Sequence, residues 1–309
     1  MTARRRPAVT FRQAATKYLG ELGRQQAADR AAYAMAHLLP AIGDLQLTHV
    51  YDGALQPYIA QRKAEGAAAG TINKELGYVA RITNLAARVW RHPNNLPYLD
   101  TAPLIRLVPG AARKPYPLTT EEQGRLLGHM PLHLATACLF AIHTGLRSGE
   151  LTSLRWEWEL RLPGLDVPCF LLPATVTKSG LERVVVLNRV ARRVIEAQRG
   201  KCHTTVFSYE GRPVTRLLNS AFIAARVRAG LPQVRAHDLR HTFGSRLRAA
   251  GVSFEDRQDL LGHTSSRGIT THYSAVDLGR LLEAVEKLVE VRAPAILRLA
   301  PIASLQGVS

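Results

Sequence analysis

Apolar residues recur at steps of three and four along residues 71–90, TINKELGYVARITNLAARVW. The apolar positions are Ile72, Leu76, Val79, Ile82, Leu85 and Ala86. This spacing places them on one face of an α-helix, because a helix turns once every 3.6 residues. The polar residues from Thr71 to Lys74 open the run as a helix cap would. The pattern predicts an amphipathic helix with one buried face.

The chain before that helix also has helical patterns and hardly any strand signal. Residues 31–50 are rich in alanine, and Pro40 and Gly43 interrupt the helical pattern there. In LQPYIAQRKAEG, residues 55–66, the final Gly66 is a typical helix stop. We expect residues 1–91 to form a small helical bundle.

A proline-rich segment separates this bundle from the rest of the chain. Between residues 92 and 117, proline occurs at positions 93, 97, 103, 109, 115 and 117. Proline removes a backbone donor and fixes φ, so such a segment cannot continue a helix. The composition predicts an extended interdomain linker over residues 92–117.

The remaining chain alternates between helical patterns and a strand-rich patch. Thr119 and Glu122 have capping-box spacing, and an apolar helix at 134–142 ends at Gly145. The sequence VTKSGLERVVVL, residues 176–187, predicts two strands joined by a turn at Lys178–Ser179–Gly180. Further helices follow at 236–251, 253–262 and 277–291. The last has a clear apolar stripe made of Leu278, Leu281, Leu282, Val285, Leu288 and Val289.

These patterns predict a mostly α fold with a small antiparallel β-sheet, of the α+β class. We expect a helical domain over residues 1–91, a linker, and a mixed α/β domain over residues 118–291. The tail at 292–309 is apolar but broken by Pro294 and Pro301. We expect it either to dock on a neighbouring subunit or to remain a disordered end.

Composition narrows the class of protein. The 309 residues are 46% hydrophobic and 21% charged, which suits a globular protein of about two domains. No apolar run reaches the roughly 20 residues that a membrane span needs, and MTARRRPAVT lacks the apolar core of a secretory signal. We therefore expect a cytoplasmic protein. Its three cysteines, Cys138, Cys169 and Cys202, support neither a disulfide framework nor a zinc site.

Charge indicates the kind of partner. There are 41 lysines and arginines against 24 aspartates and glutamates, a net charge of +17. Residues 1–91 contain 13 basic and six acidic residues, net +7, so both halves of the chain are basic. Solubility alone could explain such an excess, but it more often marks a polyanionic partner such as nucleic acid. We expect both domains to bind that partner.

Two groups of residues in the second domain could contact a phosphate. Arg147 follows the helix end at Gly145, and Glu150 lies three residues on, where its carboxylate can orient the guanidinium. His237, Arg240 and His241 share one helix face, and their repulsion would be relieved by an anion between them. A surface ion pair and a basic face that touches only DNA backbone are the alternative interpretations.

Three further residues could take part in chemistry. Lys178 lies at the predicted turn, where a flexible ammonium can deliver a proton or remain a solvated charge. His263 follows Gly262, a predicted helix end, and a polar run leads from it to Tyr273. Tyr273 is either a surface aromatic or a nucleophile.

The candidate residues follow one another in a definite order: Arg147, Lys178, His237-x-x-Arg240, Gly262-His263 and Tyr273. This ordered set resembles that of the tyrosine recombinase family, the phage integrases and related site-specific recombinases. The resemblance covers nearly the whole chain. It implies an N-terminal core-binding domain, a catalytic domain, and no separate arm-binding domain before them.

The resemblance also implies a role for each residue. Tyr273 matches the nucleophile and Lys178 the lysine of the β-hairpin. Arg147 and Arg240 match the two catalytic arginines, and Glu150 matches the acidic residue that supports the first of them. His237 and His263 match the two histidines of the family's set.

One spacing departs from the family. Tyr273 lies ten residues after His263, where most members have nine, and Gly268 can absorb the extra residue as a bulge. ITTHYSA otherwise matches integrases of phage and genomic-island type.

The function implied is site-specific DNA recombination through a covalent 3′-phosphotyrosine, for integration or excision of a mobile element. We expect no metal and no cofactor, because no carboxylate cluster or phosphate-binding glycine loop is present. The implied partners are duplex DNA with specific sites, further copies in a tetrameric synapse, and an accessory DNA-bending protein. An Xer-like dimer-resolution recombinase, a type IB topoisomerase-like relaxase and a non-catalytic DNA-binding protein are the alternatives.

The first domain offers candidate DNA contacts. We expect phosphate contacts from Arg62, Lys63 and Lys74, with Thr71 and Asn73 near base edges. Solvated helix faces are the alternative explanation. Phosphate contacts position a protein without specifying a sequence, so the target sequence does not follow from these residues.

Overall fold

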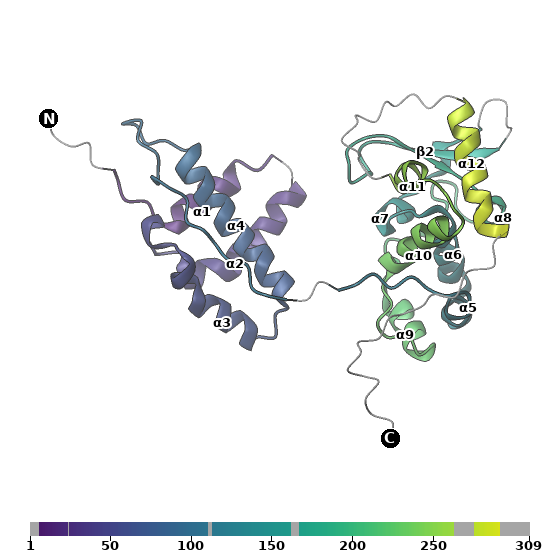
Figure 1. Cartoon of the computed structure of the whole chain (residues 1–309), viewed down its shortest axis with the longest axis horizontal. Helices are drawn as coiled ribbons and strands as arrows, with labels where there is room; N and C mark the ends of the chain where they lie inside the picture. Colours follow the sequence, from purple (N-terminus) through teal and green to yellow (C-terminus); the bar gives the residue numbers. More distant parts are fainter. Residues whose placement is uncertain (1–5, 24, 111–112, 162–166, 263–274, 291–309) are drawn as a thin grey trace, which may run out of the picture. The chain divides into compact units, whose positions relative to one another are not determined.

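The computed structural model describes residues 6–23, 25–110, 113–161, 167–262 and 275–290. The chain divides into two compact units, Met1–Arg113 and Lys114–Ser309. Each unit has its own hydrophobic core, and Figure 1 shows the helices and strands of each. The α+β class predicted from the sequence is confirmed: helices dominate, and the described strands pair antiparallel.

The first unit is built from α1 (Phe11–Gly20), α2 (Gln25–Ile42), α3 (Gln56–Ala64) and α4 (Ala69–Arg88). Short 3₁₀ helices at Leu47–His49 and Asp52–Leu55 connect α2 to α3. Helix α4 packs on α1, α2 and α3. Its buried face includes the apolar positions 72, 76, 79, 82 and 86 that the sequence pattern predicted.

The end of α2 lies beyond the proline expected to interrupt it. Pro40 is inside the last turn, and the helix continues to Ile42. A proline near a helix C-terminus removes only one backbone donor, which the turn tolerates. Gly43, whose amide bonds to Leu39 O at 2.9 Å, is where the helix stops.

Much of the predicted linker belongs to the first unit. Residues 102–110 form neither helix nor strand, as the prolines predict. Leu99 and Val108 are nevertheless buried in the core of that unit. Arg106 N also donates to the Asp52 carboxylate at 3.0 Å. Residues 92–110 therefore pack on the helical bundle, and the boundary between units falls after Arg113.

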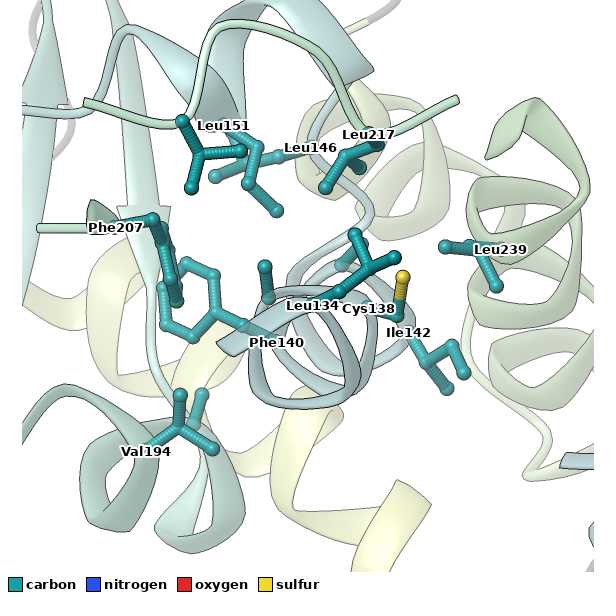
Figure 2. Packing of buried hydrophobic residues seen from close by; sticks show 14 of the residues in the cluster. Leu134, Cys138, Phe140, Ile142, Leu146, Leu151, Val194, Phe207, Leu217 and Leu239 are labelled. Carbon is teal, nitrogen blue, oxygen red and sulfur yellow. The ribbon is translucent and has the colours of Figure 1, made fainter. Parts of the chain in front are cut away.

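Helix α6 (Leu132–Thr144) lies at the centre of the second unit. It packs against α5 (Thr120–Gly128), α7 (Ser148–Thr152), α8 (Arg189–Glu196) and α10 (Ala236–Ala249). Figure 2 shows its apolar side chains, Phe140 and Ile142 among them, surrounded by residues from several elements. Burial on all sides explains why the sequence here is apolar without a polar face.

Three strands form the main sheet, in the order β1 (Glu159–Arg161), β2 (Pro168–Leu172) and β3 (Arg183–Val186). The pairs are antiparallel, with Leu172 opposite Arg183. The predicted turn at 178–180 is present, since Gly180 N donates to Thr177 O at 3.3 Å, but the first strand already ends at Leu172, so ten residues, 173–182, join the strands. A second, two-stranded pair is formed by β4 (Ser208–Tyr209) and β5 (Arg212–Pro213).

Helices α9 (Ser220–Arg228), α11 (Phe254–Leu261) and α12 (Ala275–Glu290) complete the described part of this unit. Helix α12 packs on α6, α8, α10, α11 and β3. Its buried residues, including Leu281 and Val285, join a separate cluster with Phe243 and Leu247 of α10. This cluster fixes α10 and α11 relative to the sheet.

Candidate active site

Arg147 is positioned by the end of α6. Gly145 ends that helix in the left-handed conformation, with φ of 63°. A Cβ there would lie 2.3 Å from Phe243 Cδ1, so no other residue fits without displacing α10. Arg147 then begins α7, and its backbone N–H donates to Glu150 Oε2 at 2.8 Å. The chain thus turns sharply between two helices and places the guanidinium beside Glu150.

The Glu150 carboxylate is 2% exposed and carries two guanidinium groups. Arg147 Nη1 donates to Oε1 at 2.6 Å, and Arg183 Nη1 donates to Oε2 at 2.8 Å. Burial alone would raise the pKa of this carboxyl, but the charges of Arg183 and Arg147 and their hydrogen bonds hold the pKa below its usual value. Glu150 therefore stays ionised at neutral pH and bonds Arg147 through both carboxylate oxygens, and its supporting role in catalysis stays a prediction.

Arg240 of α10 approaches the same place from the other side. It is 4% exposed. Its Nη1 donates to Gly145 O at 2.6 Å, and its Nη2 donates to Leu261 O. Burial, and then the charges of Arg183 and Arg147, lower the pKa of Arg240 to about 9. The Glu150 carboxylate acts in the opposite direction, and a bound phosphate would favour the charged guanidinium in the same way.

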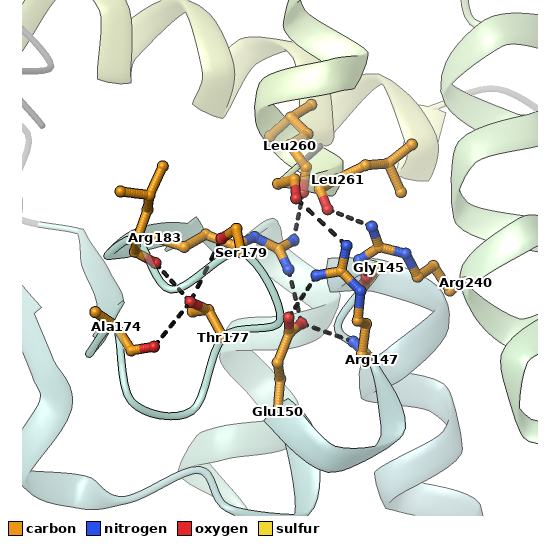
Figure 3. Close-up of polar contacts among 12 residues, drawn as sticks. Gly145, Arg147, Glu150, Ala174, Thr177, Ser179, Arg183, Arg240, Leu260 and Leu261 are labelled. Atoms are coloured by element: carbon orange, nitrogen blue, oxygen red, sulfur yellow. Dashed lines mark hydrogen bonds and ion pairs between the residues drawn. The ribbon is translucent and has the colours of Figure 1, made fainter. Parts of the chain in front are cut away.

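The three arginines meet at the C-terminus of α11 (Figure 3). Leu260 O accepts from Arg183 Nη2 at 2.5 Å, Leu261 O accepts from Arg240, and Gly262 O lies 3.4 Å from Arg147 Nη2. A helix C-terminus carries partial negative charge, which favours cations there. Against three guanidinium groups, however, Glu150 supplies one full negative charge. The cluster is therefore electrostatically suited to an anion.

His237 lies one helical turn before Arg240 on α10 and is exposed. Its ring meets that of His241 edge to face, with centroids 4.7 Å apart. Partial burial, followed by repulsion from His241 and Arg240, lowers its pKa below the ordinary value. His237 is therefore neutral at pH 7 and able to accept a proton.

Lys178 is exposed in the loop that joins β2 to β3. The loop is shaped by Thr177, whose hydroxyl donates to Leu181 O at 2.6 Å. Ser179 Oγ donates in turn to Thr177 Oγ1 at 3.4 Å. Figure 3 shows Thr177 and Ser179 on the side of the arginine cluster that Arg183 occupies. Lys178 therefore lies in a loop that is held by hydrogen bonds next to the arginine cluster.

His263 and Tyr273, predicted as a phosphate ligand and as the nucleophile, lie outside the described residues. The residue before His263 is described: Gly262 ends α11 with φ of 57°, as the sequence predicted. The predicted C-terminal tail at 292–309 likewise lies outside the described residues.

Two of the predicted DNA contacts in the first unit have structural roles instead. The Arg62 guanidinium is 9% exposed and bonds the buried Glu75 carboxylate, with Nη2 to Oε1 at 2.8 Å, as well as Glu65. Asn73 donates to Val108 O at 3.0 Å and accepts from Val108 N at 2.7 Å. We correct both predictions on this ground, since these groups are already engaged within the unit.

The other three candidates, Lys63, Thr71 and Lys74, are exposed. Thr71 and Lys74 line an open groove of about 840 Å³ between α1, α2 and α4. Arg30 and Arg81 line the same groove, together with Tyr18, Tyr33 and Tyr78. Basic and aromatic side chains in one groove suit a nucleic-acid surface. The sequence alone did not single out Arg30 and Arg81, because they lie on different helices.

Arg183 is the residue of the cluster that the sequence interpretation missed. It opens β3, followed by three consecutive valines, and an arginine at the start of such a strand is expected to point to solvent. No local signal reveals that its partners are Glu150, 33 residues earlier, and Leu260, 77 residues later.

Neither a metal-binding group nor a membrane helix is found in the described ranges. Within them, no three His, Cys, Asp or Glu side chains gather in a way that could hold a metal ion. No helix of that part of the chain is both long and apolar enough to cross a bilayer.

Residues 118–280 match the model of the phage integrase family. The integrase of Salmonella phage P22 is 29% identical over 239 residues, a match that covers 70% of this chain and 59% of that protein. Tyrosine recombinase XerC of Brucella suis biovar 1 (strain 1330) is 27% identical over 273 residues, covering 81% of this chain and 79% of that protein. In four of the matches to such relatives, this chain spans 54–62% of the relative's length.

The solved structures show the same fold. A lambda integrase dimer bound to a COC′ core site superposes with a TM-score of 0.66 at 17% identity. That match covers 86% of this chain and 80% of the other. It therefore extends beyond the second unit.

Proposed function

Because the chain belongs to the phage integrase family, whose model matches residues 118–280, we propose that it is a site-specific DNA recombinase acting through a covalent 3′-phosphotyrosine. One observation carries the proposal. Arg147 and Arg240 converge from two helices on the C-terminus of α11, one residue before His263, with Glu150 holding Arg147. A scissile phosphate there would supply the negative charge that the cluster lacks.

In the first step, the Tyr273 oxygen attacks the scissile phosphorus, the phosphotyrosyl bond forms and the bond to the 5′-oxygen breaks. Tyrosine has a pKa of about 10, so its proton must leave during attack. His237, which its lowered pKa leaves neutral at pH 7, is the proposed group that assists that removal. The leaving 5′-oxygen would otherwise depart as a strong base, and Lys178 is the proposed proton donor.

The transition state gathers negative charge on the non-bridging oxygens of the phosphate. Arg147, Arg240 and His263 are the proposed groups that neutralise it. Removing one preorganised donor of this kind typically costs about 3–4 kcal/mol of transition-state stabilisation. The covalent intermediate retains the energy of the phosphodiester, so attack by a new 5′-hydroxyl rejoins the strand without external fuel. We therefore propose a transesterase and not a nuclease.

Double-stranded DNA is the proposed partner of both units. The groove lined by Arg30, Lys74 and Arg81 is the proposed surface of the first unit, and the arginine cluster is that of the second. Recombination needs two sites, so we further propose that several copies assemble on DNA. A solved relative, lambda integrase, is described as a tetramer bound to a Holliday junction.

Integration or excision of a mobile element is the first candidate role, supported by the match to the P22 integrase. Dimer resolution is the second. The observation that favours it is the match to XerC of Brucella suis, which covers four-fifths of both proteins. Sequencing the joined products separates the two roles, because resolution acts on repeated sites of one molecule.

The test of the proposed function is covalent capture. The protein is incubated with fragmented genomic DNA of its host, and protein-linked fragments are precipitated from detergent and sequenced. A nicked duplex of the recovered sequence, which loses its 5′-fragment after cleavage, is then used to accumulate the adduct. We expect a single denaturation-resistant band. A topoisomerase-like relaxase would give a different result. The captured fragments would then have random sequences, and the protein would relax any supercoiled plasmid as a monomer.

The assignment of the nucleophile is tested by Tyr273→Phe, which removes only the phenolic oxygen. We expect this variant to bind the nicked duplex and to form no adduct. Tyr209→Phe is the matched control, because Tyr209 is an exposed tyrosine in β4 of the same unit. An adduct with Tyr273→Phe, or its loss with Tyr209→Phe, would disprove the assignment.

A further inference from the structure

Arg183 is a buried arginine for which the proposed chemistry has no direct use. It begins β3, and its side chain is 6% exposed. Its guanidinium is divided between two elements: Nη1 donates to Glu150 Oε2 at 2.8 Å, and Nη2 donates to Leu260 O at 2.5 Å. The planar fork of an arginine can bond acceptors on two elements at once, which a single ammonium does less well.

The contact with Glu150 bears directly on Arg147. Each oxygen of the Glu150 carboxylate accepts from a different guanidinium, Oε1 from Arg147 and Oε2 from Arg183. A carboxylate held at both oxygens has a fixed plane, so the donor on the other oxygen is fixed as well. Arg147 N also donates to Oε2, so without Arg183 the carboxylate would be bonded by Arg147 alone, and the Arg147–Glu150 pair would lose its connection to β3.

The contact with α11 bears on the residue that follows Gly262. A Cβ on Gly262 would lie 2.6 Å from Arg183 Cδ and 2.8 Å from its Nε. The end of α11 therefore packs directly on the Arg183 side chain, which also holds Leu260 O. His263 is the next residue in the chain. One side chain thus joins the support of Arg147 to the helix end that leads into the segment carrying His263 and Tyr273.

We propose that Arg183 is a positioning residue for strand transfer. It holds Glu150, and through it Arg147, in a fixed position relative to the end of α11. This inference rests on the proposed function. Arg183 also affects Arg240: after burial, it is the charged neighbour that lowers the pKa of Arg240 most, by repulsion. Loss of Arg183 would therefore change the electrostatics of Arg240 as well as the contacts of Glu150.

The variants are Arg183→Gln, which keeps hydrogen bonding and removes the charge, and Arg183→Lys, which keeps the charge and removes the fork. Arg199→Gln is the matched control, because Arg199 also bonds two carboxylates, Glu159 and Glu196, on the same unit. The full chain is used, with the nicked duplex recovered by covalent capture. Single-turnover cleavage at saturating DNA and the Kd for DNA are measured separately.

A misplacement of about 1 Å at a reacting centre can cost about 100-fold in rate. We expect Arg183→Gln to slow cleavage by about 10- to 100-fold. Arg183→Lys should be slowed less. The Kd should change by less than about threefold, since phosphate contacts elsewhere dominate affinity. Arg199→Gln should match the wild type.

The inference is overturned if Arg183→Gln cleaves at the rate of the Arg199→Gln control. If Arg183→Gln does not fold, the same comparison is made with Arg183→Lys.

A second substrate separates positioning from general loosening. Replacing one non-bridging oxygen of the scissile phosphate by methyl removes one negative charge from the transition state, so the arginines matter less. We expect the defect of Arg183→Gln to shrink on this substrate, as that of Arg147→Ala should. An equal defect on both substrates would show that Arg183 stabilises the fold without positioning Arg147, and the inference would fail.

A third measurement requires no DNA. Hydrogen exchange of residues 254–262 reports whether Arg183 holds the end of α11. Arg183→Gln should exchange faster there than the wild type and Arg199→Gln, and unchanged exchange would overturn the inference. If the wild type forms no adduct while this exchange increases as expected, the proposed function fails and the anchoring of α11 by Arg183 stands.

Discussion

At the scale of single residues, the site depends on a shared carboxylate. Glu150 alone is too buried to stay charged without partners, and two guanidinium groups keep its pKa low. The same residue type at the same spacing from an arginine would be an ordinary surface pair if it were exposed. Burial therefore turns a common sequence pair into a fixed support.

Lys178 can be tested by changing the leaving group. We expect Lys178→Ala to form the covalent adduct slowly, because the 5′-oxygen then leaves without a proton. A 5′-sulfur leaving group needs no proton, so it should restore the cleavage rate of this variant. Lys201→Ala, in the same unit, is the control and should cleave normally. Failure of sulfur to restore cleavage would remove Lys178 from the role of general acid.

Arg62 and Lys63 are adjacent in sequence but opposite in environment. Arg62 bonds the buried carboxylate of Glu75, whose pKa it holds down against burial, whereas Lys63 is exposed. Arg62→Met should lower the free energy of unfolding of the first unit by about 3–5 kcal/mol, the usual cost of leaving a buried charge unpaired.

Lys63→Met is the control and should change that free energy by less than about 0.5 kcal/mol. Urea unfolding followed by hydrogen exchange across α4 reports on this unit alone. Equal stability of the two variants would contradict the structural role of Arg62.

At the scale of elements, Asn188 joins three helices. It caps α8 through its Oδ1, which accepts from Ala191 N at 3.0 Å. Its Nδ2 lies 3.1 Å from His143 Nδ1 of α6 and 3.2 Å from Val285 O of α12. Because Nδ2 can only donate, His143 Nδ1 must accept and therefore carries no proton. Protonation of His143 would place two donors face to face at this junction.

The junction predicts acid lability. Burial, and then the charge of Arg246, lower the pKa of His143 to about 4, whereas an unfolded histidine has a pKa of about 6.5. Between these two pKa values, His143 binds a proton in the unfolded state but not in the folded state. Stability is therefore full above about pH 6.5 and falls as the pH drops towards 4, by about 3 kcal/mol in total.

His143→Gln cannot titrate there and should lose about 3 kcal/mol less than the wild type between pH 7 and pH 4, measured by urea unfolding. His203→Gln is the control, since His203 is exposed. If the pH profile of His143→Gln ran parallel to that of the wild type, the junction would not be the site of acid sensitivity.

At the scale of the whole molecule, positive charge is shared between the two units. Met1–Arg113 has 15 basic and seven acidic residues, net +8, and the rest of the chain has 26 and 17, net +9. Both units can therefore neutralise phosphates. Affinity for duplex DNA should fall steeply with salt, because each neutralised phosphate releases counterions.

The groove of the first unit can be tested through that salt dependence. Lys74→Ala and Arg81→Ala should each reduce the slope of log K against log salt by about 1 for any duplex of about 30 base pairs. Arg12→Ala removes the same charge from α1, where Arg12 pairs with Asp44 outside the groove lining, and should leave the slope unchanged. Equal slopes for all three variants would show that the groove does not bind DNA.

The sequence by itself located α4, α5, α6, α10, α11 and α12 and several of their ends, but not α1, α8 or α9. Thr119 with Glu122, Gly145 and Gly262 act on backbone groups within a few residues, so local chemistry is sufficient to place them. It also determined the class of fold and the identity of Arg147, Glu150 and Arg240 as a candidate set, because residue type and order are properties of the chain.

Only the tertiary structure decided which polar and charged side chains are available to a partner. Arg62 and Asn73 are engaged within the first unit, Arg183 joins the site, and residues 92–110 pack on the helical bundle. Each of these outcomes depends on groups at least 13 residues away in sequence, and burial by distant segments leaves no periodic or spacing signal. The sequence identified most of the charged residues of the site. Long-range packing decided which of them are available to bind a phosphate.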